Sequence, residues 1–143
     1  MREVGPDGAV AHHPLELGAD ALARVGAAVI GEDEVRGDAE LVARLAAAVP
    51  VVAFTHGARG CEVIVRRRTW RVGVHPAREV DPTGAGDVFA AAFFLALARG
   101  EDPLQAARLG AAAGSIAVEA RGGGALGRVG EAFARAAHVP VVP

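Results

Sequence analysis

One seven-residue stretch constrains the fold of this chain more than any other: Asp81-Pro82-Thr83-Gly84-Ala85-Gly86-Asp87. The apolar run Val88–Ala98 follows it directly, so the stretch is a glycine-rich loop that opens a helix. The small residues from Thr83 to Gly86 allow several backbone N–H groups to converge on one point. The first amides of a helix lack partners within the helix, and they lie at the positive end of its dipole. The sequence therefore predicts an anion-binding turn at the start of this helix.

Asp87 places a carboxylate beside this predicted anion site. As a phosphate ligand it makes no electrostatic sense, because like charges repel. It makes sense as a general base that takes a proton from a hydroxyl while the amides hold the charge building on a phosphoryl group. The alternative is that Asp87 is the N-cap of the helix, since Asp is a favoured capping residue. Taken alone, the glycines and Asp87 fit both interpretations.

The complete string resembles the C-terminal signature of ribokinase-like (PfkB-type) carbohydrate kinases, without a gap. The resemblance implies that Asp87 is the catalytic base toward a sugar hydroxyl and that the amides of Gly84, Ala85 and Gly86 form the anion hole. It also implies that Asp81 lies close to the phosphates and the cation, and that Thr83 belongs to the nucleotide site. The implied cofactors are ATP and Mg²⁺, with a monovalent cation as a further candidate.

A second pattern follows a predicted strand over residues 26–30, where Gly31-Glu32-Asp33-Glu34 places carboxylates at the end of the strand. Open α/β sheets bind ligands at this end of their strands. The family resembled has Asn-x-x-Glu here, and its Glu helps to organise magnesium and phosphate, usually through water. Glu34 matches that Glu and is the metal candidate, whereas Gly31 departs from the Asn and supplies no side-chain oxygen. A solvated acidic loop is the alternative for Glu34.

The third pattern is Thr55-His56-Gly57-Ala58-Arg59-Gly60, which separates predicted strands over residues 51–55 and 61–65. Two glycines between strands are typical of any tight hairpin. The resemblance adds that Thr55, Gly57 and Gly60 lie near the nucleotide phosphates. His56 is predicted to be a turn residue, because nothing in the sequence pairs it with a nucleophile.

Two helices are predicted after the glycine-rich turn. The first ends near Gly100, and Asp102-Pro103 caps and starts the second, which runs over residues 104–119. The small residues of the second helix, among them Ala113 and Gly114, permit close approach to the first helix or to a flat ligand. The resemblance implies that adenine lies in this neighbourhood, and ordinary helix packing explains the same pattern.

The remaining segments give less specific signals. They predict a helix over 15–25, a helix over 39–49 capped by Asp38, a hairpin of strands 61–65 and 70–74 around the basic run 66–68, a terminal helix over 130–138 and a frayed tail over 139–143.

Length and composition exclude several classes of protein. The 143 residues, 52% of them apolar, are enough for one α/β domain over residues 1–143 and too few for two. A net charge of −2 gives no field that would recruit nucleic acid or an anionic membrane. The single cysteine, Cys61, excludes an internal disulfide. No signal peptide or membrane-length apolar run is recognised, which predicts a cytoplasmic chain.

The predicted architecture is a three-layer α/β/α sandwich of ribokinase type, truncated, with mostly parallel strands and one hairpin. Members of the family carry, ahead of this region, a segment that holds the sugar and builds a β-sheet lid. Nothing before Asp81 matches that segment, which predicts low activity at best. A homodimer or a partner chain could complete the site.

Three functions are therefore compared. The first is an ATP-dependent phosphotransferase acting on an alcohol group of a sugar-like small molecule, and the second is a non-catalytic nucleotide-binding or structural fragment. The third, a dinucleotide-binding oxidoreductase, requires Gly-x-Gly-x-x-Gly. Gly84-Ala85-Gly86 is followed by Asp87-Val88-Phe89, so the third glycine is missing.

Overall fold

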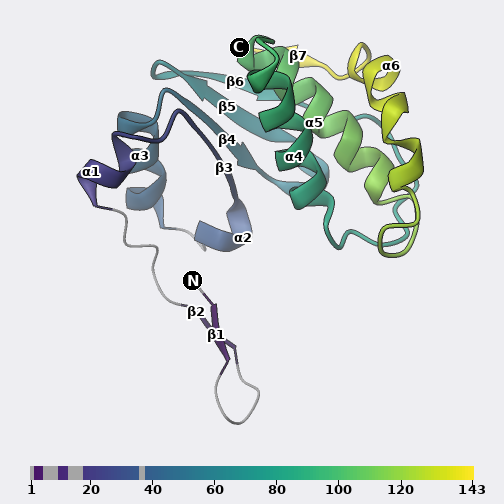
Figure 1. The fold of residues 1–143 in the computed structure, drawn as a ribbon, viewed down its shortest axis with the longest axis horizontal. Coiled ribbons are helices and arrows are strands. Elements are labelled where there is room, and N and C mark those ends of the chain that lie inside the picture. The colour runs from purple at the N-terminus through teal and green to yellow at the C-terminus, as the bar shows by residue number, and fades with distance from the viewer. Residues whose placement is uncertain (1, 5–9, 13–17, 36–37) are drawn as a thin grey trace.

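The computed structural model describes residues 2–4, 10–12, 18–35 and 38–143 (Figure 1). A small two-stranded sheet pairs the first two strands, and a five-stranded sheet carries the rest. The strands are β1 (Arg2–Val4), β2 (Val10–His12), β3 (Ala27–Gly31), β4 (Val51–Thr55), β5 (Cys61–Val65), β6 (Arg68–Val72) and β7 (Val141–Val142). The helices are α1 (Ala19–Leu22), α2 (Glu32–Val35), α3 (Ala39–Ala48), α4 (Ala85–Ala98), α5 (Pro103–Ala117) and α6 (Ala132–Ala136), with 3₁₀ turns η1 (Gly57–Arg59) and η2 (Leu126–Glu131).

The five-stranded sheet has the order β3-β4-β5-β6-β7. Among the described strands of this sheet, only β3 and β4 are parallel, whereas β4–β5, β5–β6 and β6–β7 are antiparallel. The prediction of mostly parallel strands was therefore wrong for the described residues. Consecutive strands from β4 to β6 are joined by very short turns, and a parallel pair needs a crossover of a dozen or more residues. Helices α2 and α3 belong to such a crossover, between β3 and β4.

Helices cover both faces of this sheet, as expected for a three-layer sandwich (Figure 1). Neighbouring residues of β4 point to opposite faces, so Val52 packs in one core cluster and Ala53 in the other. On the first face, Leu41 and Leu45 of α3 cover Val52. Asp38 caps α3 as predicted, because its Oδ1 accepts a hydrogen bond from the Leu41 amide at 2.9 Å.

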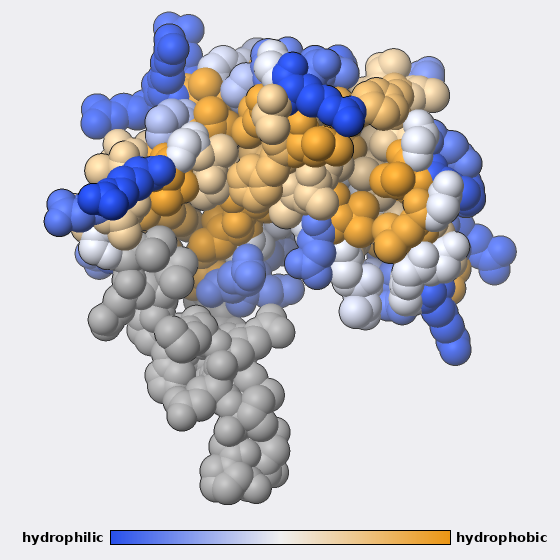
Figure 2. All heavy atoms as spheres, viewed as in Figure 1, coloured by the Kyte–Doolittle hydropathy of each residue, from blue (hydrophilic) through white to orange (hydrophobic). Residues whose placement is uncertain are grey.

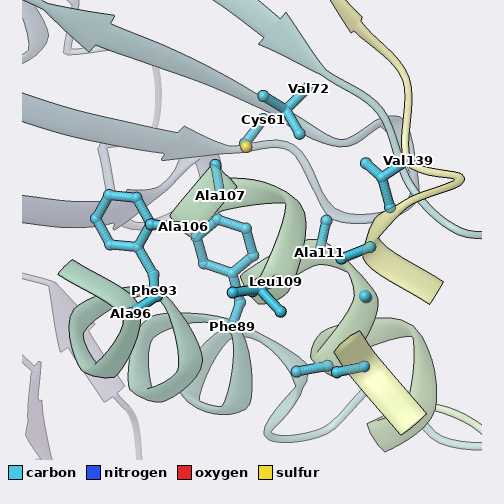
Figure 3. Packing of buried hydrophobic residues seen from close by; sticks show 14 of the residues in the cluster. Cys61, Val72, Phe89, Phe93, Ala96, Ala106, Ala107, Leu109, Ala111 and Val139 are labelled. Carbon is cyan, nitrogen blue, oxygen red and sulfur yellow. The ribbon is translucent and has the colours of Figure 1, made fainter. Parts of the chain in front are cut away.

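The second face is covered by α4 and α5, which pack closely against each other (Figure 3). Phe93 and Ile116 are completely buried there, and the rings of Phe89 and Phe93 are stacked with centroids 5.9 Å apart. A Cβ atom at Gly110 would lie 3.0 Å from the Phe89 ring, so a small residue is required at this crossing. The N-cap of α5 is Asp102, which accepts from the amides of Leu104 and Gln105, as predicted.

The β5–β6 hairpin begins as predicted but is tighter. Arg66 and Arg67 form the turn with φ of 48° and 68°, and Arg68 already belongs to β6. The second strand is therefore residues 68–72 and not 70–74. Trp70 lies half-buried opposite Val63.

Two other predicted segments were also wrong. The predicted 130–138 helix is a 3₁₀ turn followed by the short α6, and the predicted frayed tail contains β7, which pairs with β6. Val139 is completely buried, and the Gly73 amide donates to the Pro140 carbonyl at 2.9 Å. Of the predicted 15–25 helix only α1 is seen, and residues 13–17 lie outside the described part of the chain.

An ion-pair cluster fastens η2 and α6 to the end of α5. The Glu119 carboxylate accepts from the guanidinium groups of Arg135 at 2.7 Å and Arg128 at 2.8 Å. Both arginines also pair with Glu131. The hydrogen bond from Arg135, together with that from Arg128, lowers the pKa of Glu119 below its ordinary value. The charged form of Glu119 is therefore favoured in the folded chain.

This cluster gives a prediction for the stability of the chain in acid. Because the folded-state pKa of Glu119 is lowered, its stabilising contribution is present above the unfolded-state pKa and is lost as the pH falls through the folded-state value. Glu119→Gln is expected to lower the free energy of unfolding by about 1 kcal/mol at pH 7. Urea titrations from pH 7 to pH 3 should show this difference shrinking with falling pH. Glu62→Gln is the control, since Glu62 only approaches Arg71 at 3.7 Å on the surface. If the loss in unfolding free energy caused by Glu119→Gln stayed the same at every pH, the stabilising role given to the ionised Glu119 carboxylate would be contradicted.

Candidate functional site

The glycine-rich turn enters α4 through a left-handed residue. Gly84 is the N-cap with φ of 81°, a conformation that strains residues with a Cβ atom. Asp87 is the third residue of α4 and its carboxylate is exposed. The interpretation of Asp87 as the N-cap was therefore wrong. In the described part of the chain its carboxylate has no hydrogen-bond or ion-pair partner, which leaves it available to a ligand.

The backbone amides of this turn are partly open. The Ala85 amide donates to the Pro82 carbonyl at 3.2 Å, and the first bond within the new helix runs from Val88 to Gly84. Among the described residues, no acceptor is found for the amides of Gly84 and Gly86. Two of the three predicted anion-hole amides, those of Gly84 and Gly86, are thus open to an anion, whereas the Ala85 amide closes the turn.

Asp81 ties this turn to another loop. Its Oδ1 accepts from the Thr83 amide at 3.0 Å, and its Oδ2 accepts from the Gly122 amide at 3.0 Å. The N–H groups of Gly122 and Thr83 lower the pKa of Asp81. Asp81 therefore holds the loop after α5 against the entry to α4, a contact between residues 41 positions apart. No local sequence pattern indicates it.

Glu34 lies at the carboxyl end of β3, as predicted. It belongs to the short helix α2, and its Oε2 accepts from the Gly31 amide at 2.7 Å. A Cβ atom at Gly31 would lie 3.4 Å from this oxygen and 3.6 Å from Oγ1 of Thr55, so Glu34 and Thr55 flank the same point. The described residues contain no cluster of three or more potential metal ligands. Glu34 can therefore supply one carboxylate, but these residues form no cage for a metal.

The turn after β4 depends on both of its glycines. Gly57 has φ of 57° and Gly60 has φ of 91°. The His56 amide donates to the Gly60 carbonyl at 2.8 Å, which closes the turn beyond Thr55. A Cβ atom at Gly60 would lie 2.2 Å from the Val72 carbonyl oxygen, so this glycine is required by the packing against β6.

His56 and Arg59 contact the segment that follows β3, which the sequence did not indicate. Nδ1 of His56 lies 3.3 Å from Oε2 of Glu32, and Arg59 pairs with the same oxygen. The His56 ring also meets Phe54 edge-on, with centroids 4.6 Å apart. The ends of the parallel strands β3 and β4 are thus joined through Glu32.

Ala113 and Gly114 lie where α5 crosses the start of α4. Ala113 is completely buried, and a Cβ atom at Gly114 would lie 3.4 Å from the Ala85 carbonyl oxygen. Close helix packing accounts for both positions. Their predicted contact with adenine stays a prediction.

A hollow of about 670 Å³ lies beside α3, apart from the glycine-rich turn. It is lined by residues of α2, α3 and β4, among them the apolar Val35, Val42 and Phe54 and the acidic Glu32 and Asp33. The glycine-rich turn does not line this hollow.

The described part of the chain contains no helix long and apolar enough to cross a membrane.

Comparisons with known proteins agree with this arrangement. The sequence profile of the pfkB family carbohydrate kinases matches residues 22–127. The bifunctional protein HldE of Mesorhizobium japonicum is 36% identical over 99 residues, which are 68% of this chain and 20% of that protein. Inositol 3-kinase of Arabidopsis thaliana is 40% identical over 68 residues, which are 48% of this chain and 19% of that protein.

A solved structure shows the same fold. An E. coli protein described as a ribokinase II, in complex with ATP and Mg²⁺, superposes with a TM-score of 0.67 at 26% identity. The match covers 82% of this chain and 42% of that one. The chain thus has the ribokinase-like architecture that the glycine-rich signature implied. It spans about a fifth of the length of the curated relatives and less than half of the matched structure.

Proposed function

Because this chain belongs to the pfkB family of carbohydrate kinases, we propose that it carries the catalytic and nucleotide-binding part of an ATP-dependent phosphotransferase. The acceptor is an alcohol group of a sugar or a related small molecule. One observation carries this proposal: an exposed carboxylate, Asp87, lies in the first turn of a helix whose entry leaves the amides of Gly84 and Gly86 open.

The open amides and the Asp87 carboxylate act on different groups in the same reaction: the amides on the negative phosphoryl group, and the carboxylate on the proton of the acceptor. Open amides at the positive end of the 14-residue helix α4 stabilise negative charge building on a phosphoryl group. The Asp87 carboxylate accepts the proton of the attacking hydroxyl, so the acceptor oxygen becomes a better nucleophile as it approaches phosphorus. The proton moves to Asp87 while the amides hold the transferred group.

Magnesium fits this site as an ion carried by the nucleotide. Mg²⁺ keeps several waters and is usually held by one or two carboxylates together with substrate phosphates. Glu34 supplies one such carboxylate beside Thr55, and the matched E. coli structure contains ATP and Mg²⁺. When bound, the ion neutralises phosphate charge. The monovalent cation near Asp81 stays a prediction from the resemblance.

A non-catalytic nucleotide-binding or structural role is the second candidate. Gly31 gives it some support, because this position lacks the side-chain oxygen found in the kinases that the motif resembles. Asp87 opposes it, because an exposed carboxylate beside two open amides supplies the base that turnover needs, and its interaction with the helix dipole contributes only a small structural benefit. The two candidates differ in turnover, whereas both allow nucleotide binding.

Calorimetric titration of the chain with MgATP tests the part of the site that is present. We expect saturable binding that Gly84→Ala weakens by about tenfold or more, because the left-handed N-cap is strained by a Cβ atom. Gly100→Ala is the matched control: Gly100 has φ of 87°, lies just beyond the other end of α4, and also has open space around its Cβ position. Both variants should lose similar stability, but only Gly84→Ala should lose affinity. A folded chain that binds no nucleotide, or equal affinities in both variants, would contradict the proposal.

A further inference from the structure

One carboxylate joins the two loops that follow the parallel strands. Glu32 is the first residue of α2, directly after β3, and His56 and Arg59 lie in the turn after β4. Oε2 of Glu32 lies 3.3 Å from Nδ1 of His56, and the Arg59 guanidinium pairs with the same oxygen. Figure 2 shows hydrophilic residues where Figure 1 places α2, at the end of β3. In the described part of the chain, no other side-chain hydrogen bond or ion pair joins α2 to this turn.

The turn that Glu32 contacts is fixed internally. The His56 amide donates to the Gly60 carbonyl at 2.8 Å, which closes the turn. Gly60 lies so close to the Val72 carbonyl oxygen that no Cβ atom fits there, so the turn is also held against β6. A carboxylate bound to both His56 and Arg59 therefore holds the whole turn from its other side.

The two loops carry the candidate residues for the metal and the phosphates. Glu34 follows Glu32 by two residues on α2, and Thr55 immediately precedes the turn. A Cβ atom at Gly31 would lie 3.4 Å from Oε2 of Glu34 and 3.6 Å from Oγ1 of Thr55. The pairing of β3 with β4 ends at Gly31 and Thr55. Beyond this pair, Glu32 supplies the side-chain link between the two loops.

We propose that Glu32 is a positioning residue of the nucleotide site, which holds the β4–β5 turn against α2 so that Thr55 and Glu34 stay side by side. Glu32 does not itself bind the nucleotide, because a carboxylate repels phosphate oxygens. It acts through His56 and Arg59, whose contacts fix where the turn lies. The role in nucleotide binding rests on the proposed function, whereas the tether between the loops does not.

The sign of the change in affinity separates positioning from charge. The test is calorimetric titration of the wild-type chain and of Glu32→Ala with MgATP. If only charge matters, removal of a carboxylate near the phosphates should raise the affinity. Positioning predicts the opposite result, a loss of about fivefold or more, because the turn loses both contacts. Glu32→Gln keeps a hydrogen-bond acceptor of the same reach, so it should recover part of this loss.

Asp33→Ala is the matched control. Asp33 is the next residue of α2, carries the same charge, and has no hydrogen-bond or ion-pair partner among the described residues. Its replacement should leave the affinity for MgATP unchanged or raise it. Both variants should fold, because neither side chain belongs to a core cluster.

Hydrogen exchange reports on the tether without nucleotide. The amides of His56 and Arg59 donate within the turn, and they should exchange faster in Glu32→Ala than in the wild type or in Asp33→Ala. Unchanged exchange would overturn the inference, and so would an affinity that Glu32→Ala leaves unchanged or raises. Either result would leave the proposed function standing. A folded wild-type chain that binds no MgATP would instead contradict the proposed function, and with it the role of Glu32 in nucleotide binding.

Discussion

Replacing Asp87 by Asn is expected to abolish phosphoryl transfer while nucleotide binding is retained. The amide of Asn has nearly the same shape as the carboxylate but cannot accept the proton of the attacking hydroxyl. General-base catalysis contributes roughly 10²–10⁴-fold, so the loss in turnover should be at least of this order. The fold should be preserved, because Asp87 is exposed and has no partner within the described residues. Only its favourable position near the helix dipole is lost, which costs about 0.3–1 kcal/mol.

The experiment needs turnover and binding measured on the same protein. Turnover is followed as ADP release with a panel of sugars and polyols as acceptors. Asp102→Asn is the matched control, since Asp102 caps the next helix and Asn is an equally good capping residue. It should leave turnover unchanged. Turnover retained in the Asp87 variant would remove this residue from the mechanism.

Gly60→Ala is expected to have the largest effect on stability. The added Cβ atom would lie 2.2 Å from the Val72 carbonyl oxygen and about 3 Å from the backbone of Gly73, and φ at Gly60 is 91°. All of the atoms that the Cβ atom would approach belong to the backbone, and none is the end of a flexible side chain. The main chain of β6 must therefore move. Because Val72 pairs with Cys61, this movement disturbs the register of β5 and β6. We expect a loss of about 3 kcal/mol or more in the free energy of unfolding.

Gly57→Ala separates strain from steric overlap. Gly57 also has positive φ, at 57°, but its Cβ position has open space. This substitution should cost only about 1 kcal/mol, the strain of the left-handed conformation. Urea denaturation of both variants at equal pH measures the difference. Similar losses in both would mean that β6 accommodates the Cβ atom and that packing does not require glycine at position 60.

Local backbone chemistry made much of the fold predictable. The Asp38 and Asp102 caps, the helix end at Gly100 and the glycines of the β4–β5 turn act within a few residues of their own position. Such signals are read correctly because their physical cause is local: a side-chain oxygen within reach of an amide, or a φ that only glycine adopts freely. The entry to α4 at Gly84 belongs to the same group.

The candidate site was only partly predictable, because several of its contacts join residues that lie far apart in the chain. The sequence indicated an anion-binding turn with a carboxylate, but it gave no sign that the Ala85 amide is already paired with Pro82. It also could not show that Asp81 binds the Gly122 amide, or that Glu32 joins His56 and Arg59, because these partners are far apart in the chain. The family resemblance supplied the roles that these residues are expected to have, and the geometry supplied their contacts.

The sequence by itself determined the class of the protein and its principal turn, because the string from Asp81 to Asp87 combines residue types whose effects are local. The tertiary structure alone decided the direction of the strands, the pairing of β7 and the ion pairs of Glu119. A two-residue strand such as Val141–Val142 has no periodicity of its own, and it forms only because β6 offers an edge next to the buried Val139. Partners like these exist only after the chain has folded, so no local pattern encodes them.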